Sequence, residues 1–518
     1  MGMMLLFALI ACENPSVGGS DDNTPSLRFS ITPTRQGFSS ISHFDAATRN
    51  YQFSLPFGTE TITVTTQSVA GDSIVPLSIQ GTAPNGAALG IRAVGGAVEI
   101  SRMATGMNRV QVAVPQEVGG NPETYTVLFH VLPLFNFRTA VSHTTNALLD
   151  GANNLASMEI SGRQILFVAG SSSNAVSAYE VRASGENLSL NLRGSVSDST
   201  NASTYHLQGA EDVAVATVGA KNLLFVAGST DDGISVFEIN LTGNSLILTN
   251  KANVKDSDAT NYELDGVYAL DLAVVGGKTL LFAAGKDDHG FSVFEVLVSG
   301  DTVTLSPKAH ETDSATSYLQ GPRDIHHARF GGKDLLFVPS FDEHGVSVYE
   351  VAVSGANVTL THRTRVVDDT NSNIRGAYGL TSTTVGGQNL LIVAGFSDSG
   401  ISAYEIGVAG NTVSLTHKAR LTDSLTINLN GAYSVEALTV AGETYLFVPA
   451  FSENGLGGFT ISVSGSTVTL HNQARQNFSA GRELLGVTDT HVLTLGQKLY
   501  LFTAAQNDDG LGSYELGL

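Results

Sequence analysis

A short motif that recurs seven times constrains the fold of this chain more than any other feature. It reads STDDGISVFEI at 229–239, KDDHGFSVFEV at 286–296 and QNDDGLGSYEL at 506–516. The position of Gly233 recurs at 175, 233, 290, 345, 400, 455 and 510, with spacings of 58, 57, 55, 55, 55 and 55 residues. A second glycine keeps step at Gly151, Gly209, Gly266, Gly321, Gly376, Gly431 and Gly486. Seven units of one period indicate a repeat architecture.

Each unit is predicted to contain four strands. In the second unit these are EDVAVATVG (211–219), NLLFVAG (222–228), GISVFEINLTG (233–243) and SLILTNKANVKD (245–256). Nearly continuous apolar strands are typical of sheets covered on both faces, as when blades stack around an axis. A solenoid would need polar caps at its two ends, whereas a ring needs closure.

The two ends of the repeat region predict that closure. The sequence stops at Leu518, just after the third strand of unit seven. Before unit one, FNFRTAVSH (135–143) precedes Gly151 as the fourth-strand segment THKARLTD (416–423) precedes Gly431. We therefore expect an all-β chain in which residues 134–518 form a seven-bladed β-propeller closed by an N-terminal strand.

In blade number and strand-rich repeats, this region resembles the lactonase-like seven-bladed propellers. That resemblance implies, as one alternative, a metal-dependent hydrolase that uses polar residues of the central channel. None of the family's catalytic motifs carries over residue by residue.

Residues 27–133 alternate apolar and polar residues in short runs separated by turn clusters such as Gly81–Gly86 and Gly119-Gly120-Asn121. Short alternating strands predict a small antiparallel sandwich. The segments 50–66 and 105–131 also resemble the cadherin-like β-sandwich domain of bacterial surface proteins. The resemblance rests on Gly106-Met107-Asn108 before one strand and Tyr125-Thr126 before the last. It implies no catalytic residues.

Cys12 is the only cysteine and follows an apolar run from Met3 to Ala11. The segment Leu9-Ile10-Ala11-Cys12 resembles the lipobox of bacterial lipoproteins, which implies a signal peptide at 1–12 and an acylated Cys12, for example with palmitate. The run is too short to span a bilayer. No Lys or Arg precedes it, so an ordinary free cysteine is the alternative. Glu13 after the cysteine implies, within this resemblance, the outer membrane; periplasmic and surface exposure both stay open.

Composition narrows the classes of partner. Residues 13–26 (ENPSVGGSDDNTPS) are predicted to be a flexible linker, and no later stretch is long and apolar enough for a transmembrane helix. One cysteine allows no internal disulfide. The formal charge of −21 argues against nucleic acid and anionic membrane surfaces. It favours cations, basic partners or solubility alone.

Acidic loops are predicted on one face of the disc, where the loops between strands two and three meet those between strands four and one. Oxygen-rich loops suit Ca²⁺, although no loop has EF-hand spacing. The alternative is that the Asp-Gly pairs form tight turns. His289 and His344 are likewise expected to be exposed turn residues. The calcium candidates are Asp231, Asp232, Asp287, Asp288, Asp508 and Asp509.

The first strand of each blade should line the central channel. Five residues after each framing glycine stand Ala156, Ala214, Asp271, His326, Thr381, Glu436 and His491. Two positions earlier are Asn154, Asp212, Asp324, Ser434 and Asp489. Imidazoles and carboxylates that converge on a channel could hold a metal or act as acid and base. Solvated residues of a wet pore are the alternative. The candidate channel site is Asp271, His326, Glu436 and His491.

Two functional hypotheses follow, and the sequence does not identify ligand, metal or oligomeric state. The first is a lipid-anchored binding or adhesion protein of the bacterial cell envelope that contacts a protein or glycan through propeller loops. The second is the hydrolase that the propeller resemblance implies. A third possibility is a purely structural envelope protein. No nucleophile elbow, zinc-protease motif or phosphate-binding loop is present in the sequence.

Overall fold

The computed structural model describes residues 28–33, 40–43, 50–67, 78–94, 97–114, 123–198 and 205–518. These residues are mostly β-strand, and their helical structure is limited to 3-10 turns at Asp198 and at Asp256–Asp258. In the same ranges no helix is long and apolar enough to cross a membrane. The predicted signal peptide with Cys12, the linker 13–26 and the turn cluster at Gly119-Gly120-Asn121 lie outside the described residues.

The chain divides into two compact units, one up to Asn136 together with Leu516–Leu518 and one from Phe137 to Glu515. The first is the predicted sandwich. One sheet has the order β2-β1-β4-β7-β6 and the other β3-β9-β8-β5. Their bounds are β1 Arg28–Pro33, β2 Ser40–His43, β3 Asn50–Leu55, β4 Thr61–Gln67, β5 Ser78–Thr82, β6 Gly90–Val94, β7 Ala97–Ser101, β8 Gly106–Val114 and β9 Glu123–Val131.

Inward-facing apolar side chains of both sheets form the core of the sandwich, among them Ile62, Val110 and Phe129. Asn108, from the predicted Gly-x-Asn motif, is fully buried. Its Nδ2 donates to the carbonyl oxygens of Ala104 (2.7 Å) and Phe129 (3.3 Å). The motif is therefore structural: it fixes the start of β8 against β9.

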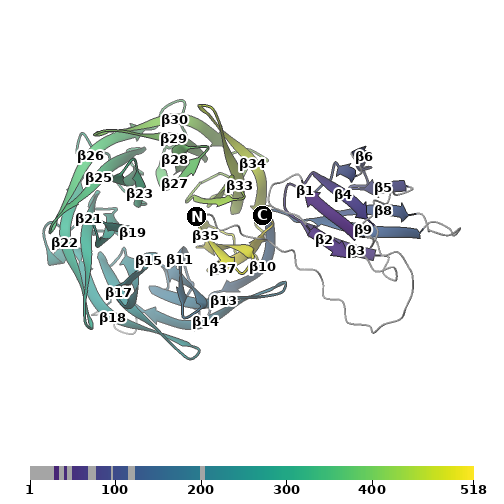
Figure 1. Cartoon of the computed structure of the whole chain (residues 1–518). Coiled ribbons are helices and arrows are strands. Elements are labelled where there is room, and N and C mark those ends of the chain that lie inside the picture. Colours follow the sequence, from purple (N-terminus) through teal and green to yellow (C-terminus); the bar gives the residue numbers. More distant parts are fainter. Residues whose placement is uncertain are drawn as a thin grey trace. The chain divides into compact units, whose positions relative to one another are not determined.

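The second unit is the predicted ring of seven four-stranded sheets, numbered here as blades 1 to 7 (Figure 1). The innermost strands are β11 (Ala152–Ile160), β15 (Ala210–Val218), β19 (Val267–Val275), β23 (His326–Phe330), β27 (Ala377–Val385), β31 (Glu436–Val440) and β35 (Val487–Leu495). The second strands are β12 (Arg163–Gly170), β16 (Lys221–Gly228), β20 (Lys278–Gly285), β24 (Lys333–Ser340), β28 (Gln388–Gly395), β32 (Glu443–Ala450) and β36 (Lys498–Ala505).

The outer strands complete each blade. Third are β13 (Ala175–Ser184), β17 (Gly233–Thr242), β21 (Gly290–Ser299), β25 (Gly345–Ser354), β29 (Gly400–Ala409), β33 (Gly455–Ser464) and β37 (Gly510–Leu516). Fourth are β14 (Asn187–Ser197), β18 (Ser245–Lys255), β22 (Thr302–Thr312), β26 (Asn357–Val367), β30 (Thr412–Thr422) and β34 (Thr467–Asn477). In blade 7 the fourth place is taken by β10 (Phe135–Ser142), as predicted, in the order β10-β37-β36-β35.

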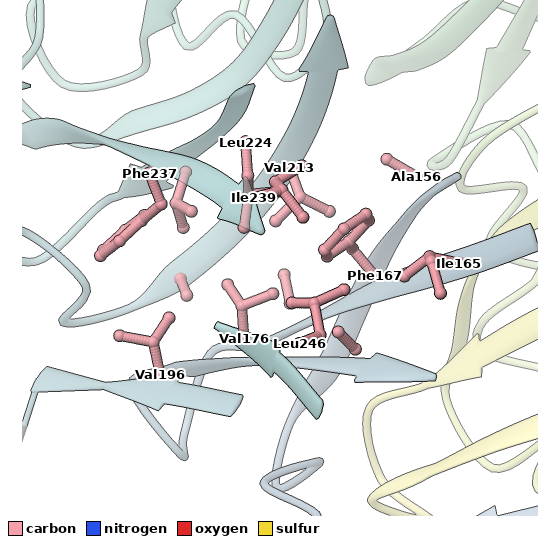
Figure 2. Close-up of a cluster of buried hydrophobic side chains, with 14 of the residues drawn as sticks. Ala156, Ile165, Phe167, Val176, Val196, Val213, Leu224, Phe237, Ile239 and Leu246 are labelled. Carbon is pink, nitrogen blue, oxygen red and sulfur yellow. The ribbon is translucent and has the colours of Figure 1, made fainter. Parts of the chain in front are cut away.

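Apolar side chains fill the spaces between neighbouring blades. Figure 2 shows the cluster between blades 1 and 2, in which Phe167 and Val176 meet Val213, Leu224 and Phe237. A corresponding cluster joins the two ends of the repeat. There, Tyr500 and Phe502 of blade 7 pack with Leu155, Leu166 and Tyr179 of blade 1. The ring is thus closed by core packing as well as by β10.

The serine of the repeat motif has the same structural role in five blades. In blades 1 to 5 the motif serine accepts a hydrogen bond from a backbone N–H 29 residues earlier, in the loop that leads into the same blade. These serines are Ser177, Ser235, Ser292, Ser347 and Ser402. The buried hydroxyls therefore anchor the loops that precede the innermost strands.

Candidate functional site

A cavity of about 550 Å³ lies on the ring axis and is lined by the innermost strand of every blade or by the residues that lead into it. All four candidate channel residues, Asp271, His326, Glu436 and His491, line it. The second predicted set, Asn154, Asp212, Asp324, Ser434 and Asp489, lines it as well. The structure therefore brings both predicted sets around one space.

The acidic members of these sets join neighbouring blades. The Asp212 carboxylate accepts a hydrogen bond from the backbone N–H of Leu270 in the next blade (2.6 Å). Asp271 and Glu436, which belong to the first predicted set, do the same. Their acceptor atoms lie 2.6 Å from the nitrogen of His327 and 3.1 Å from that of Val492. The remaining pairs are Asn154–Val213 (3.4 Å), Asp324–Leu380 (2.8 Å) and Asp489–Leu155 (3.0 Å).

Six of the seven blade-to-blade steps thus have a side-chain acceptor for an N–H of the next innermost strand. The step from blade 5 to blade 6 uses close approach instead. A Cβ added at Gly379 would lie 2.6 Å from the Cα of Ser434 and 2.7 Å from the carbonyl oxygen of Tyr433. The six side-chain acceptors explain much of the polarity of the channel, because they hold neighbouring blades together.

The two histidines also contact the following blade. His326 Nε2 lies 2.9 Å from the Ser382 hydroxyl, and His491 Nε2 lies 2.7 Å from the Ser157 hydroxyl. Burial lowers the pKa of each imidazole to about 4. Both rings are therefore neutral near pH 7.

Burial has the opposite effect on the channel carboxyls, because it disfavours their charged form. It raises the pKa of Asp271 and Asp489 to about 7, of Asp324 to about 6 and of Glu436 to about 8. The pKa of Asp212 is raised as well, first by burial and then by the charges of Asp324 and Asp489. Near neutral pH these carboxyls are therefore partly protonated.

No three His, Cys, Asp or Glu side chains within the described part of the chain come close enough to hold one metal ion. The carboxylates are instead distributed around the wall, each on its own backbone N–H. The metal and acid–base roles given above to the channel residues stay predictions.

A third layer of residues that line the cavity was not predicted. Its members stand two residues after each framing glycine: Asn153, Glu211, Tyr268, Arg323, Tyr378, Tyr433 and Thr488. Tyr268, Tyr378 and Tyr433 come from blades 3, 5 and 6, yet their hydroxyls lie within 2.5 to 2.6 Å of one another. The three side chains therefore reach across the channel. We call them the tyrosine cap. Counting the position two residues after each glycine would have found it.

Arg323 lies against this cap. Its guanidinium carbon is 4.9 Å from the ring centre of Tyr268, 5.7 Å from that of Tyr378 and 5.3 Å from that of Phe341. Cation–π contacts of this kind hold a guanidinium without a carboxylate partner.

Beside the cap lies an unbroken series of aromatic rings, here called the aromatic ladder, in the order Phe341, Tyr378, Phe396, Tyr433, Phe451. Successive ring centres are 5.9, 5.8, 6.3 and 5.6 Å apart. The three phenylalanines are half-buried and begin the acidic loops between strands two and three of blades 4, 5 and 6. The ladder therefore adds apolar surface to the otherwise acidic face.

The calcium candidates of the loops are also engaged with backbone. Asp232 has a φ of 53° and accepts a hydrogen bond from the framing Gly266 of the next blade (2.9 Å). Asp509 does the same for Gly151 (3.0 Å), which links blade 7 to blade 1. Asp231, Asp288 and Asp508 accept from Gln208, Asp265 and Leu484, and Asp287 pairs with Lys286. The turns are thus also contacts between or within blades; calcium binding stays a prediction.

His289 and His344 occupy the same turn position as Asp232, with φ values of 57° and 59°. Their Nδ1 atoms accept from the framing glycines Gly321 (3.2 Å) and Gly376 (3.1 Å). These histidines are turn residues, as expected, and they also join blades.

Residues 25–132 match the family described as the cadherin-like beta sandwich domain. The match covers the sandwich and not the propeller. The search of curated proteins found no match.

Solved structures with a similar fold were found at low identity. A "putative 6-phosphogluconolactonase" from Bacteroides uniformis is 12% identical, with a TM-score of 0.45 over 71% of this chain and 95% of the other. A protein from Lactobacillus plantarum is 11% identical, with a TM-score of 0.42 over 72% and 100%. Hydrazine synthase from Kuenenia stuttgartiensis is 12% identical, with a TM-score of 0.43 over 72% and 97%. Similarities of this size carry no functional assignment.

Proposed function

We propose that this protein is a non-enzymatic binding protein and that the aromatic ladder of its propeller contacts a glycan. The observation that carries the proposal is the contrast between the two sets of candidate residues. The channel carboxylates and imidazoles bond to the next blade, whereas the rings of the ladder bond mainly to one another.

The chemistry of the ladder suits a sugar. Aromatic faces carry partial negative charge and attract the C–H groups on the flat face of a sugar ring. Each phenylalanine stands one or two residues before an acidic side chain, namely Asp342, Asp398 and Glu453. Their carboxylates are acceptors for sugar hydroxyls, so one surface offers both kinds of contact.

Cell-envelope location is part of the proposal and rests on the lipobox resemblance around Cys12. A lipid-anchored propeller with a cadherin-like sandwich would present its loops as an adhesion module. Radioactive palmitate labelling of the full chain tests this part: we expect labelling that is lost in Cys12→Ser. Labelling that persists in Cys12→Ser, or none in the parent, overturns the anchor.

Affinity electrophoresis tests glycan binding, in gels that contain xylan, laminarin, dextran or galactomannan. We expect at least one polysaccharide to retard the protein and Phe396→Ala to weaken the interaction at least ~tenfold, equal to about 1.4 kcal/mol. Val274→Ala removes apolar surface from an exposed residue (69%) near the end of β19, away from the ladder, and should change nothing. No retardation in any gel, or an unchanged Phe396→Ala, contradicts the proposal.

The lactonase-like hydrolase is the alternative and depends on His326, Glu436 and His491. A folded Glu436→Gln variant that loses a lactone-hydrolysing activity present in the parent would favour the hydrolase over the binding protein. The glycan-binding proposal expects equal retardation of parent and variant.

A further inference from the structure

The wall of the central cavity has more carboxyl groups than cationic side chains. Asp212, Asp271, Asp324, Glu436 and Asp489 all line it. Among the described residues none of these five forms an ion pair with a Lys or Arg side chain. Buried carboxyls without a counter-charge are unfavourable, and a bound cation relieves them.

Arg323 is the only Lys or Arg among the residues that line the cavity. It is held by ring faces at the tyrosine cap and, in the described chain, forms no salt bridge. Its Nε is buried and has no hydrogen-bond acceptor. The guanidinium therefore leaves one donor at the cap end of the cavity available to a ligand oxygen.

Two acceptors in the cavity wall are also unpartnered. The Asn153 side chain is only 4% exposed; its Nδ2 donates to Glu211, while its Oδ1 has no donor. Glu436 uses one oxygen for the N–H of Val492, and its Oε2 is buried without a partner. Since buried polar atoms are nearly always hydrogen-bonded, these atoms are expected to meet a ligand.

We infer that the cavity binds a small hydroxylated primary amine, of the amino-sugar or amino-polyol class. The ammonium group lies among the carboxyls near Glu436, where its N–H groups meet free acceptors. A ligand hydroxyl accepts from Arg323 and donates to Asn153, which an amine without hydroxyls cannot do. A cavity of about 550 Å³ is in the usual range for small-ligand sites.

This site is separate from the proposed glycan contact, since the three phenylalanines of the ladder, Phe341, Phe396 and Phe451, do not line the cavity. The shared residues are Tyr378 and Tyr433, which belong to both the cap and the ladder. Either inference can therefore fail while the other stands.

Isothermal titration calorimetry on the full chain tests the inference, with glucosamine as the probe. Glucose lacks the amine and N-acetylglucosamine has it blocked; we expect each to bind at least ~tenfold more weakly than glucosamine. Glu436→Gln keeps an acceptor for Val492 and removes the carboxyl group that would ionise beside a bound ammonium, and it should weaken glucosamine binding at least ~fivefold. Asp301→Asn makes the same carboxyl-to-amide change on a side chain that is 98% exposed and should leave binding unchanged.

Three results overturn the inference: equal binding of glucosamine and glucose, no binding of glucosamine, or an equal effect of Asp301→Asn and Glu436→Gln. Calcium chloride is a further probe. If Ca²⁺ competes with glucosamine and binds as tightly, the wall attracts cations in general and specificity for a hydroxylated amine is wrong. Phe396→Ala should bind glucosamine like the parent, so that loss of ladder contacts and loss of the cavity site are distinguished.

Discussion

Arg138 in β10 forms an ion pair with Glu515 in β37, although the two residues are 377 positions apart. Glu515 is the glutamate of the repeat motif. In blades 2, 3 and 4 that glutamate is held by one cation from strand two and one from strand four: Glu238 by Lys221 and Lys251, Glu295 by Lys278 and Lys308, Glu350 by Lys333 and Arg363. In blade 7 these cations are Lys498 and Arg138. The N-terminal strand thus supplies the cation that the last repeat lacks.

Removing Arg138 should weaken closure of the ring. The Arg138 and Glu515 side chains are 15% and 7% exposed, and breaking a buried pair from one side costs about 3–5 kcal/mol, less here because Lys498 remains. We expect Arg138→Ala to lower the free energy of unfolding by about 2 kcal/mol, measured by urea denaturation. Lys418→Ala removes the same cation within blade 5, whose four strands are continuous in sequence. Equal losses in the two variants would show that the pair has no special role in closure.

Asp489 is the acceptor that joins the innermost strand of blade 7 to that of blade 1, and its contribution can be tested by substitution. Asp489→Ala leaves the buried N–H of Leu155 without its partner, which typically costs about 1–3 kcal/mol. Asp489→Asn retains an acceptor oxygen and should lose less than half as much. Both are read from urea unfolding curves near pH 7. If the asparagine variant loses as much as the alanine variant, the hydrogen bond to Leu155 is not what Asp489 contributes to stability.

The close approach of Gly379 in blade 5 to the backbone of blade 6 leads to a separate prediction. Gly379→Ala places a methyl group 2.6 Å from the Cα of Ser434, so one of the two innermost strands must shift. We expect a loss of about 1–3 kcal/mol in unfolding free energy. Gly407→Ala is the control, because its nearest neighbour is a serine hydroxyl that can turn away. A fully stable Gly379→Ala would mean that the two blades are not tightly packed at this point.

The fold could be predicted because equivalent residues stand at the same distance from the framing glycine in different repeats. Arg138 stands thirteen residues before Gly151, as Lys418 stands thirteen before Gly431, so the closing strand could be recognised before its partner was known. The roles of the channel residues were not predictable in the same way. Asp271 and Glu436 read as free acids in the sequence, and only the position of the next blade shows that each accepts a backbone N–H.

The third channel layer was missed for a physical reason. Strict alternation from Asp271 and His491 leads back to the third position after the framing glycine and skips the second. In blades 1, 2, 3, 5 and 7, however, the innermost strand begins with an irregular register, for example between Val267 and Ala269 in blade 3. Irregularities of this kind turn two consecutive side chains toward the same side, which accounts for Tyr268 in the channel. In blades 4 and 6 the third-layer residues Arg323 and Tyr433 instead precede the innermost strand, so the alternation of that strand does not apply to them.

The buried channel carboxyls predict an unusual dependence of stability on pH. Burial raises the folded-state pKa of Glu436 to about 8, and of Asp271 and Asp489 to about 7, above their ordinary values. An acid with a raised pKa contributes stability that is complete below its unfolded pKa and is lost as pH rises through its folded pKa. We therefore expect the free energy of unfolding to fall between about pH 4, near the unfolded pKa values, and about pH 8, the highest folded pKa.

The histidines act in the opposite direction in the lower part of this window. His326 and His491 have folded pKa values lowered to about 4, so the stability they contribute is present above about pH 6.5 and is lost as pH falls toward 4. Because Asp271, Asp324, Glu436 and Asp489 outnumber them, the two histidines reduce the decline below about pH 6.5 and do not reverse it. Urea unfolding at intervals from about pH 5 to 9 measures it, with Glu436→Gln as the matched variant. That variant should be more stable than the parent at about pH 9 and show a shallower decline above about pH 7, because Gln cannot ionise. A parent whose stability rises through pH 8 would mean that these carboxyls are ionised in the folded ring at neutral pH.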